Sequence, residues 1–315
     1  MEGIFQGKYS DIQIAGFLVA LEMKGVTIEE LTAAVRVVRA NVRPIFQAPG
    51  NFIDIMSTGG SAKKPFNVST TAMFIAAGAG VQVAKHTQRS IHTPCGSSDV
   101  LEALGVNVSV PMEKVPQSLQ TIGLGVCFSP LVHPSMKFLA PSRRSLGIRT
   151  LLDLLAPMSN PTKAKWQVIG VHSKEAMELM ASSYLSLGRA HVMLIHGKDG
   201  MDEITTVSTT YVIEVHDKKI KSYQIAPEDF AIKRSSAFKE RVIDPNSNAK
   251  IIQNILQGQK GKAADIALLN SAAVIYMSGR SKTLLQGLQL AKESLYSGKA
   301  HKKLQELITF SQSLY

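Results

Sequence analysis

The chain has 315 residues, of which 45% are hydrophobic and 19% are charged. This composition is typical of a globular protein with a sizeable core, and it excludes disordered, collagen-like and low-complexity chains. The 35 lysines and arginines outnumber the 24 acidic residues and give a net charge of +11. Such an excess indicates an anionic partner, whether nucleic acid, membrane lipid or a phosphorylated metabolite.

Two cysteines, Cys95 and Cys127, are too few for a disulfide framework, and neither lies in a spacing typical of zinc ligands. The first residues lack the basic and apolar segments of a signal peptide. The longest apolar run, residues 72–84, is shorter than the roughly 18 residues of a membrane span. We therefore expect a soluble, cytoplasmic protein that does not associate with membranes.

Residues 11–45 have the periodicity of helices, with a break at Gly25 and an N-cap at Thr27. An apolar strand over 52–56 then leads into a glycine-containing loop, a helix from Ser69 to Ala77 and a strand over 81–84. This β-loop-α-β order continues downstream. Further strands are expected near 126–128, 168–171 and 190–196, a β-ribbon over 211–225, and helices near 97–105, 134–156, 174–187, 248–257, 262–278, 284–297 and after 299.

Strands that alternate with helices indicate an α/β fold with a mostly parallel central sheet. The helical N-terminus indicates a second, smaller unit. Three loops that follow predicted strands carry charged or glycine-rich sequences: Ser57 to Lys64, Lys85 to Arg89, and Gly200 to Glu203. Each has an ordinary interpretation, namely a capped glycine turn, a solvated basic loop and an acidic turn. Together they suit a diphosphate substrate with Mg²⁺, because ligands bind beyond the carboxyl ends of parallel strands.

Six strings occur in order along the chain: DIMSTGG, FNVSTTA, AKHTQR, GSSDVLEALGV, HPSMKFLAPSRRSLGIRTLLDLLAPMSNP and GMDE. In their order and spacing the chain resembles the anthranilate phosphoribosyltransferases of tryptophan biosynthesis, from about Ile14 to the C-terminal helices. This resemblance implies a small all-helical domain, residues 1–45 joined by inserted helices at about 134–157. It also implies a large α/β domain, residues 52–133 and 158–315, and a homodimer.

The family joins anthranilate to 5-phosphoribosyl-1-diphosphate (PRPP) and releases diphosphate, with Mg²⁺ as the cofactor. Its PRPP-binding positions correspond here to Gly59, Gly60, Asn67, Ser69, Thr70 and Lys85. Its metal positions correspond to Ser69, Asp202 and Glu203, and the positions that line the path of the aromatic acid correspond to His86, Gln88, His133 and Arg143. By this resemblance, Arg143 would hold the carboxylate of the acceptor.

The sequence departs from the family in two loops. It has Ser57-Thr58-Gly59-Gly60-Ser61-Ala62 where the family has GTGGDG, and Lys85-His86-Thr87-Gln88-Arg89 where the family has KHGNR. The half of the site that binds PRPP and metal is therefore better preserved than the acceptor half. The alternatives are another aromatic acceptor, or a relative that has lost catalysis and binds nucleic acid through the basic clusters 233–241 and 299–303. His172, His191 and His196 are expected to be structural.

Overall fold

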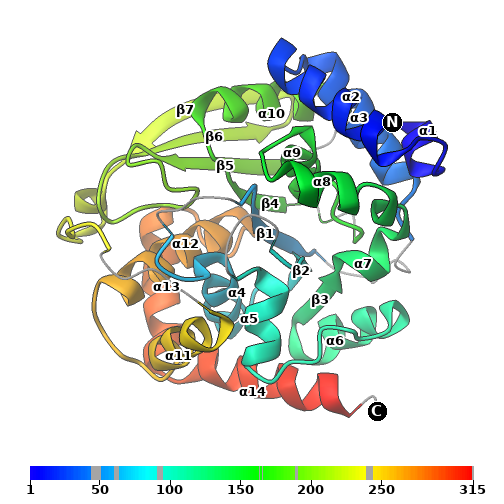
Figure 1. The fold of residues 1–315 in the computed structure, drawn as a ribbon. Coiled ribbons are helices and arrows are strands. Elements are labelled where there is room, and N and C mark those ends of the chain that lie inside the picture. The colour runs from blue at the N-terminus through cyan, green and yellow to red at the C-terminus, as the bar shows by residue number, and fades with distance from the viewer. Residues whose placement is uncertain are drawn as a thin grey trace.

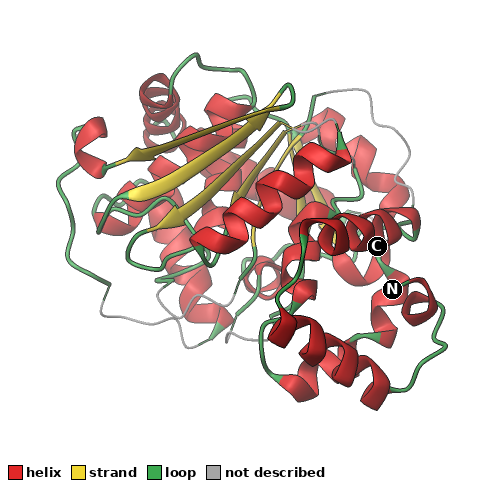
Figure 2. Ribbon diagram, turned by 90° about the horizontal axis from the view of Figure 1, so that it is seen from above, coloured by secondary structure: helices red, strands yellow, loops and turns green. Residues whose placement is uncertain are grey.

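A computed structural model describes residues 1–43, 51–59, 64–90, 95–162, 164, 166–188, 191–238 and 244–313. Its centre is a seven-stranded sheet with the strand order β3-β2-β1-β4-β5-β6-β7 (Figures 1 and 2). The strands are β1 (Ile53–Ser57), β2 (Val83–Thr87), β3 (Leu124–Phe128), β4 (Trp166–Gly170), β5 (His191–Gly197), β6 (Thr210–His216) and β7 (Lys219–Ile225). The first five in spatial order are parallel, and β6 and β7 continue the sheet as an antiparallel ribbon. The predicted α/β class and the mostly parallel sheet are confirmed.

Helices cover both faces of this sheet (Figure 2). They are α4 (Val68–Gly78), α5 (Ser97–Ala103), α6 (Val115–Ile122), α7 (Ser129–Val132), α10 (Lys174–Leu187), α11 (Pro245–Leu256), α12 (Lys262–Met277), α13 (Leu284–Tyr296) and α14 (Lys299–Gln312), with short 3₁₀ turns at Met112–Lys114 and Pro227–Phe230. On β5, Met193 and Ile195 belong to the core beneath α4 and α12, whereas Val192 and Leu194 belong to the core on the other face. The alternation follows from the two-residue period of a strand, and it explains why the parallel strands are apolar throughout.

The smaller helical layer contains two segments that are far apart in the sequence. The first is α1 (Glu2–Phe5), α2 (Asp11–Lys24) and α3 (Ile28–Ala40), and the second is the 3₁₀ turn Pro134–Phe138 with α8 (Ala140–Leu146) and α9 (Leu151–Met158). The Ser142 hydroxyl donates to the Asp11 carbonyl (3.0 Å), and Arg39 Nε donates to the Met158 carbonyl (2.8 Å). The layer lies beside the sheet at the upper right of Figure 1, and it shares one hydrophobic cluster with α10 and β5.

Local sequence explains where the N-terminal helices begin. The side chains of Ser10 and Thr27 each accept a hydrogen bond from the backbone N–H three residues on. In turn, the side chains of Gln13 and Glu30 accept from the backbone N–H groups of Ser10 and Thr27. These two capping boxes satisfy backbone donors that a helix otherwise leaves unpaired, and the predicted N-cap at Thr27 is confirmed. In the part of the chain that the structure describes, no helix has both the length and the apolar character needed to cross a membrane.

Two sequence-based expectations were wrong in detail. The strand predicted over 81–84 runs instead from Val83 to Thr87, so Lys85 and His86 are buried strand residues and not part of a basic loop. The reason is register, because β2 pairs with β3 along its whole length and both positions lie between neighbouring strands. The helix α6 was not predicted at all.

Candidate functional site

The predicted site residues gather where the parallel strands end. Thr58 and Gly59 follow β1, His133 follows β3 and α7, and Asp202 and Glu203 come after β5, whereas Lys85 and His86 lie near the end of β2. Because β1 to β5 are parallel, their carboxyl ends share one edge of the sheet. This is the edge at which ligands bind in open α/β sheets.

Two buried carboxylates form the acidic end of the site. Asp202 and Glu203 are almost completely buried, and between them lies the ammonium of Lys64. Lys64 Nζ is 3.1 Å from Asp202 Oδ2, 2.9 Å from Glu203 Oε1 and 2.7 Å from the Ser57 hydroxyl. Burial would lower the pKa of Lys64, but the two carboxylates outweigh it and hold that pKa above its usual value. Burial raises the pKa of Glu203, and Lys64 opposes that rise.

The segment that carries these carboxylates is fixed by residues that sequence reasoning missed. A Cβ atom on Gly170 would meet the Asp202 carbonyl oxygen at 1.8 Å, so only glycine allows the segment to approach β4 this closely. Asn270 of α12 accepts from the Ile204 backbone N–H (3.0 Å) and donates to the Ile204 carbonyl (2.9 Å). Asp202 and Glu203 are therefore held between β4 and α12.

The N-terminus of α4 borders the same edge. Its N-cap Asn67 exchanges two hydrogen bonds with Asn248 of α11, at 3.1 and 2.8 Å. Ser69 and Thr70 in the first turn are buried, and the Thr70 hydroxyl has no hydrogen-bond partner among the described residues. Free backbone N–H groups at a helix start, together with hydroxyls, favour a bound anion.

The loop after β1 is tied to the turn after β4. Thr58 N donates to the Gly170 carbonyl (2.8 Å), and the Thr58 hydroxyl lies 3.1 Å from His172 N and 3.2 Å from His172 Nδ1. His172 therefore links the loop after β1 to the turn after β4. Gly59 has φ +76°, a left-handed conformation that favours glycine. Gly60 lies outside the described residues.

Lys85 projects from β2 toward α4. Its ammonium donates to the Ile55 carbonyl at 2.5 Å and to the Ser69 hydroxyl at 3.4 Å. Burial lowers the pKa of Lys85 to about 8, although Asp54 on the adjacent β1 opposes the shift. Burial likewise raises the pKa of Asp54 to about 6, against the pull of Lys85. The lysine is therefore a buried cation that a second anion would stabilise.

Two imidazoles of the site, those of His86 on β2 and His133 after α7, lie close together. The rings of His86 and His133 are 4.9 Å apart, at an angle of 48°. Burial and the neighbouring His133 hold the pKa of His86 well below its usual value, and burial lowers the pKa of His133 to about 4. Both rings are therefore neutral near pH 7 and can accept a hydrogen bond.

The remaining predicted residues have partners of their own. Arg143 is buried on α8 and forms an ion pair with Asp153, while its Nε has no partner within the described ranges. Gln88 uses its backbone N–H to bind the Ser97 hydroxyl (3.2 Å). Arg89, predicted to face an anionic substrate, instead pairs with Asp99 (2.9 Å) and Glu102 (2.7 Å) of α5.

A divalent cation fits the acidic end of the site. The Asp202 Oδ1 atom is buried and has no hydrogen-bond partner in the described part of the chain, and Glu203 adds a second buried carboxylate. Carboxylate and hydroxyl oxygens are the ligands that Mg²⁺ prefers, usually one or two carboxylates with substrate phosphates. In this structure the Lys64 ammonium lies between the two carboxylates and balances part of their charge.

Two family models match the chain. The α/β domain of a glycosyl transferase family matches residues 49–301, and the helical bundle domain of the same family matches residues 1–42. The anthranilate phosphoribosyltransferase of Acetivibrio thermocellus is 42% identical over 313 residues, which cover 99% of this chain and 91% of that protein.

Solved structures agree with these matches. The anthranilate phosphoribosyltransferase of Thermus thermophilus superposes with a TM-score of 0.91 at 36% identity, over 99% of this chain and 93% of that one. The enzyme of Saccharomyces cerevisiae in complex with PRPP and Mg superposes with a TM-score of 0.88 at 25% identity, over 96% and 86% of the two chains. The sheet edge has a pair of buried carboxylates, both family models match the chain, and the relatives align along nearly its whole length. The chain therefore belongs to the anthranilate phosphoribosyltransferase family.

Proposed function

We infer that the chain transfers the phosphoribosyl group of PRPP to the amine of anthranilate, with release of diphosphate and with Mg²⁺ as cofactor. The observation that carries this inference is the buried pair Asp202 and Glu203. Glu203 interacts electrostatically with Lys85, whose ammonium also contacts Ser69 in the first turn of α4. This combination provides cation ligands and anion donors within one site. Membership of the family and the yeast relative bound to PRPP and Mg support it.

The PRPP half of the proposed site contains Gly59, Gly60, Asn67, Ser69, Thr70 and Lys85. Breaking the bond between ribose C1 and diphosphate builds negative charge on the leaving group. Lys85 and the backbone N–H groups at the start of α4 would stabilise that charge, and because the fold holds them in place little reorganisation would be needed during the reaction. Burial of Lys85 strengthens its interaction with an incoming phosphate because the local dielectric constant is low.

We assign Asp202, Glu203 and Ser69 as the residues that would hold Mg²⁺. When bound, the ion supplies charge stabilisation for the leaving diphosphate. Lys64 has to leave the position between the carboxylates for the ion to enter, and its ammonium then becomes available to a phosphate oxygen. The exposed fifth of the Lys64 side chain gives it a route out.

The acceptor half consists of His86, Gln88, His133 and Arg143. An aniline nitrogen attacks as a neutral amine, so the step requires orientation more than a strong base. The two neutral imidazoles can accept hydrogen bonds from the amine. Arg143 would receive the carboxylate with its Nε, which has no partner among the residues that the structure describes. Asp153 orients the guanidinium from the other side.

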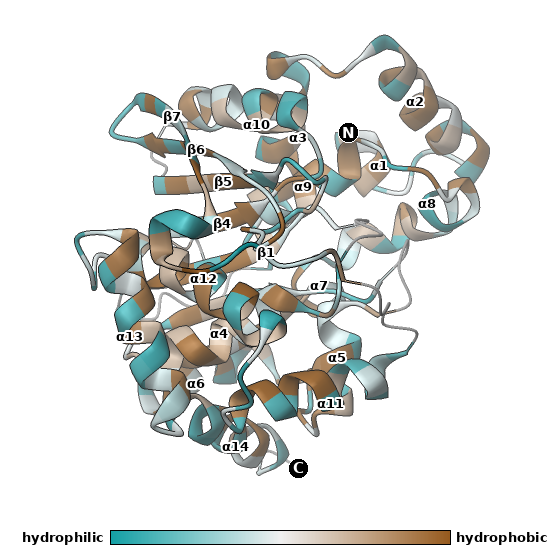
Figure 3. Cartoon of the chain, turned by 90° about the vertical axis from the view of Figure 1, so that its left-hand side faces the viewer, coloured by the Kyte–Doolittle hydropathy of each residue, from teal (hydrophilic) through white to brown (hydrophobic). Residues whose placement is uncertain are grey.

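The proposed domain bounds are residues 1–45 with 134–157 for the helical part, and 52–133 with 158–315 for the α/β part. We propose that the helical part forms a homodimer. On α2, Ile12 and Met23 are each 85% exposed, and their spacing of about three turns places them on one side of the helix. Figure 3 shows hydrophobic stretches, in brown, along α2. A second copy of the chain would cover this apolar side. Cys95 and Cys127 are buried and form no disulfide with each other, which suits a reducing cytoplasm.

The decisive experiment follows the fluorescence of anthranilate in the presence of PRPP and Mg²⁺. We expect a PRPP-dependent loss of fluorescence that requires the metal and that disappears in the double variant Asp202→Asn/Glu203→Gln. Calorimetry of PRPP·Mg²⁺ with the same variant separates lost binding from lost turnover. If diphosphate were released with another aromatic amine but not with anthranilate, the proposed acceptor would be wrong and the proposed reaction class would stand. Absence of PRPP·Mg²⁺ binding by the unmodified chain would reject the proposal.

The basic clusters do not favour the nucleic-acid alternative. Lys299 pairs with Glu293 (3.0 Å), and Lys302 and Lys303 pair with Glu306 (3.9 and 2.7 Å). These acids reduce the positive field of the 299–303 cluster, and part of the 233–241 cluster lies outside the described residues. DNA binding with a steep negative dependence of log affinity on log salt, without PRPP binding, would support the alternative instead.

A further inference from the structure

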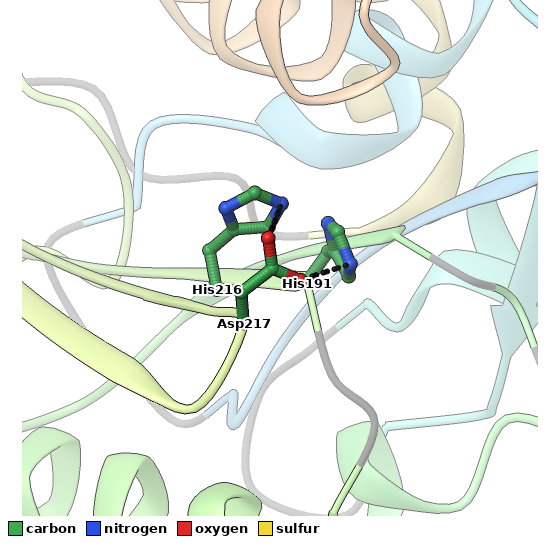
Figure 4. Close-up of side chains that lie close together, drawn as sticks. All are labelled: His191, His216 and Asp217. Carbon is green, nitrogen blue, oxygen red and sulfur yellow. Dashed lines mark ion pairs between the residues drawn. The ribbon is translucent and has the colours of Figure 1, made fainter.

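Two histidines and an aspartate meet at the edge of the sheet opposite the proposed active site. His191 is the first residue of β5, His216 is the last residue of β6, and Asp217 begins the turn to β7 (Figure 4). In the antiparallel register Val192 pairs with Val215, so His191 and His216 are cross-strand neighbours. The sheet itself therefore brings the two rings together.

The turn directs the carboxylate back over the two rings. Asp217 and Lys218 both have positive φ, +46° and +61°, and together they form a two-residue connection in which His216 pairs with Lys219. In Figure 4 the Asp217 carboxylate lies between the two imidazoles. Its Oδ1 is 3.7 Å from His191 Nε2, and its Oδ2 is 3.5 Å from His216 Nε2.

These separations are close to those of a metal site. One ligand atom from each residue lies within 4.8 Å of the others, and the ring centroids are 4.0 Å apart. Ligands about 2.0–2.2 Å from a tetrahedral Zn²⁺ ion are separated from one another by roughly 3.3 Å. Small side-chain rotations would bring the three atoms to that distance. The side chains of His216 and Asp217 are 56% and 74% exposed, so an ion can enter from solvent.

We propose that His191, His216 and Asp217 bind a divalent transition-metal ion, with Zn²⁺ as the natural occupant, through two Nε2 atoms and one carboxylate oxygen. Imidazole favours Zn²⁺ and related ions, whereas Mg²⁺ prefers oxygen ligands alone. Water completes the coordination, as in other sites with three protein ligands. The ion would clamp the β6–β7 turn onto β5.

This site is separate from the carboxylate pair of the proposed active site. His191 begins β5, whereas Asp202 and Glu203 follow its far end, and a seven-residue strand lies between them. Asp202 packs against Gly170, which pairs with Ile195, four residues along β5 from His191. At about 3.3 Å per residue the two sites are therefore about 13 Å apart along the strand direction. Zn²⁺ binding here and PRPP·Mg²⁺ binding there can therefore be measured and can fail independently.

Trp166 provides a local probe for the test. It is the single tryptophan of the chain, it pairs with His191 in the β4–β5 ladder, and the two rings are 6.5 Å apart, edge to face. The experiment titrates full-length, tag-free protein with Co²⁺ in excess Mg²⁺ and follows tryptophan fluorescence. We expect saturable quenching with one equivalent, reversed by Zn²⁺, which lacks the partly filled d shell that quenches.

Three variants make the outcome decisive. His216→Ala and Asp217→Asn each change an exposed residue, and asparagine tolerates the left-handed conformation of the turn. Because even an outer-shell partner changes metal affinity by 10–100-fold, we expect either variant to weaken Co²⁺ binding by at least about tenfold. The control His301→Ala, on α14, should bind as the unmodified chain does. Non-saturable quenching, or Co²⁺ binding by His216→Ala and Asp217→Asn that is as tight as binding by the unmodified chain, would overturn the proposal.

Discussion

The ammonium of Lys64 lies 3.1 Å from Oδ2 of Asp202, and Asp202 is fully buried. The same ammonium is 2.9 Å from Glu203 Oε1, so one lysine neutralises part of a buried charge of two carboxylates. Two adjacent buried anions without a cation would be strongly disfavoured. The chain therefore contains its own counter-ion for a site at which we propose that Mg²⁺ binds during turnover.

Replacing Lys64 by methionine should make the folded protein dependent on divalent cations. Without the ammonium, Asp202 and Glu203 repel each other, and we expect the free energy of unfolding to fall by about 1–3 kcal/mol. This loss is smaller than that for breaking a fully buried ion pair, because the Lys64 side chain is partly exposed. Added Mg²⁺ should restore the loss and should bind more tightly than to the unmodified chain, since no ammonium competes. Thermal unfolding with and without Mg²⁺ measures both effects.

Lys303→Met is the matched control for that experiment. Lys303 has similar exposure, 23% against 20%, and forms a 2.7 Å ion pair with Glu306 on α14. Its removal should cost about 1 kcal/mol or less, with no response to Mg²⁺, because a single partly exposed pair contributes little. An unchanged Mg²⁺ response in Lys64→Met would contradict the idea that the lysine and the metal share one position.

Gly170→Ala should weaken the metal site through the backbone. The added methyl carbon would lie 1.8 Å from the Asp202 carbonyl oxygen, so the segment carrying the carboxylates has to move. We expect a loss of stability of about 1–3 kcal/mol and weaker Mg²⁺ binding, measured by denaturant unfolding and calorimetry.

Gly125→Ala is the control that separates the loss of stability from the loss of Mg²⁺ affinity. Gly125 lies in the parallel strand β3, where the atoms nearest to the new Cβ would be side-chain carbons of Leu119 and Val115 of α6, at 2.8 and 3.0 Å. This variant should lose stability and retain its affinity for Mg²⁺. If Gly170→Ala bound Mg²⁺ as tightly as Gly125→Ala, the approach of Asp202 to β4 would not determine the metal site.

The sequence predicts the elements of the fold better than it predicts their contacts. The periodicity of residues 174–187 marks α10 correctly, and the ribbon over 211–225 corresponds to β6 and β7, because each pattern is local. The strand β2 was predicted too short, since its polar residues Lys85, His86 and Thr87 read as a loop. What makes them strand residues is pairing with β3, about 40 residues away in the chain.

The supporting contacts of the site depend on residues far apart in sequence. Asn67 meets Asn248 across 181 positions, and Asn270 meets Ile204 across 66. A lone asparagine in a helix carries no signal of its partner, so the contacts of Asn248 and Asn270 could not be predicted from the sequence. The charged residues were found because their types and their order after strands restrict the chemistry, yet only the folded chain pairs Arg89 with α5 rather than directing it at a ligand.

The activity should fall in alkaline solution as Lys85 loses its proton. Burial lowers the pKa of Lys85 to about 8, so the ammonium that would bind PRPP predominates below that pH and declines above it. We expect kcat/KM for PRPP to decrease about tenfold per pH unit above roughly pH 8, because this parameter reports groups of the free enzyme. Lys85→Met should be slower by about 10²–10³-fold and should lack this limb. If kcat/KM of Lys85→Met still decreased above pH 8, the decrease would be due to the titration of another group.

His133→Phe should affect the acceptor and leave the binding of PRPP·Mg²⁺ intact. Phenylalanine maintains the ring contact with His86, 4.9 Å away, but it cannot accept a hydrogen bond from an amine. The loss of such a bond costs about 0.5–1.5 kcal/mol, so we expect KM for anthranilate to rise by roughly 2–13-fold. Initial rates at saturating PRPP give the KM, and calorimetry gives the PRPP·Mg²⁺ affinity of the same preparation. Since His133 is neutral near pH 7, its pKa being about 4, the effect should be constant from pH 6 to 8. A normal KM for anthranilate together with normal PRPP·Mg²⁺ binding would remove His133 from the acceptor site.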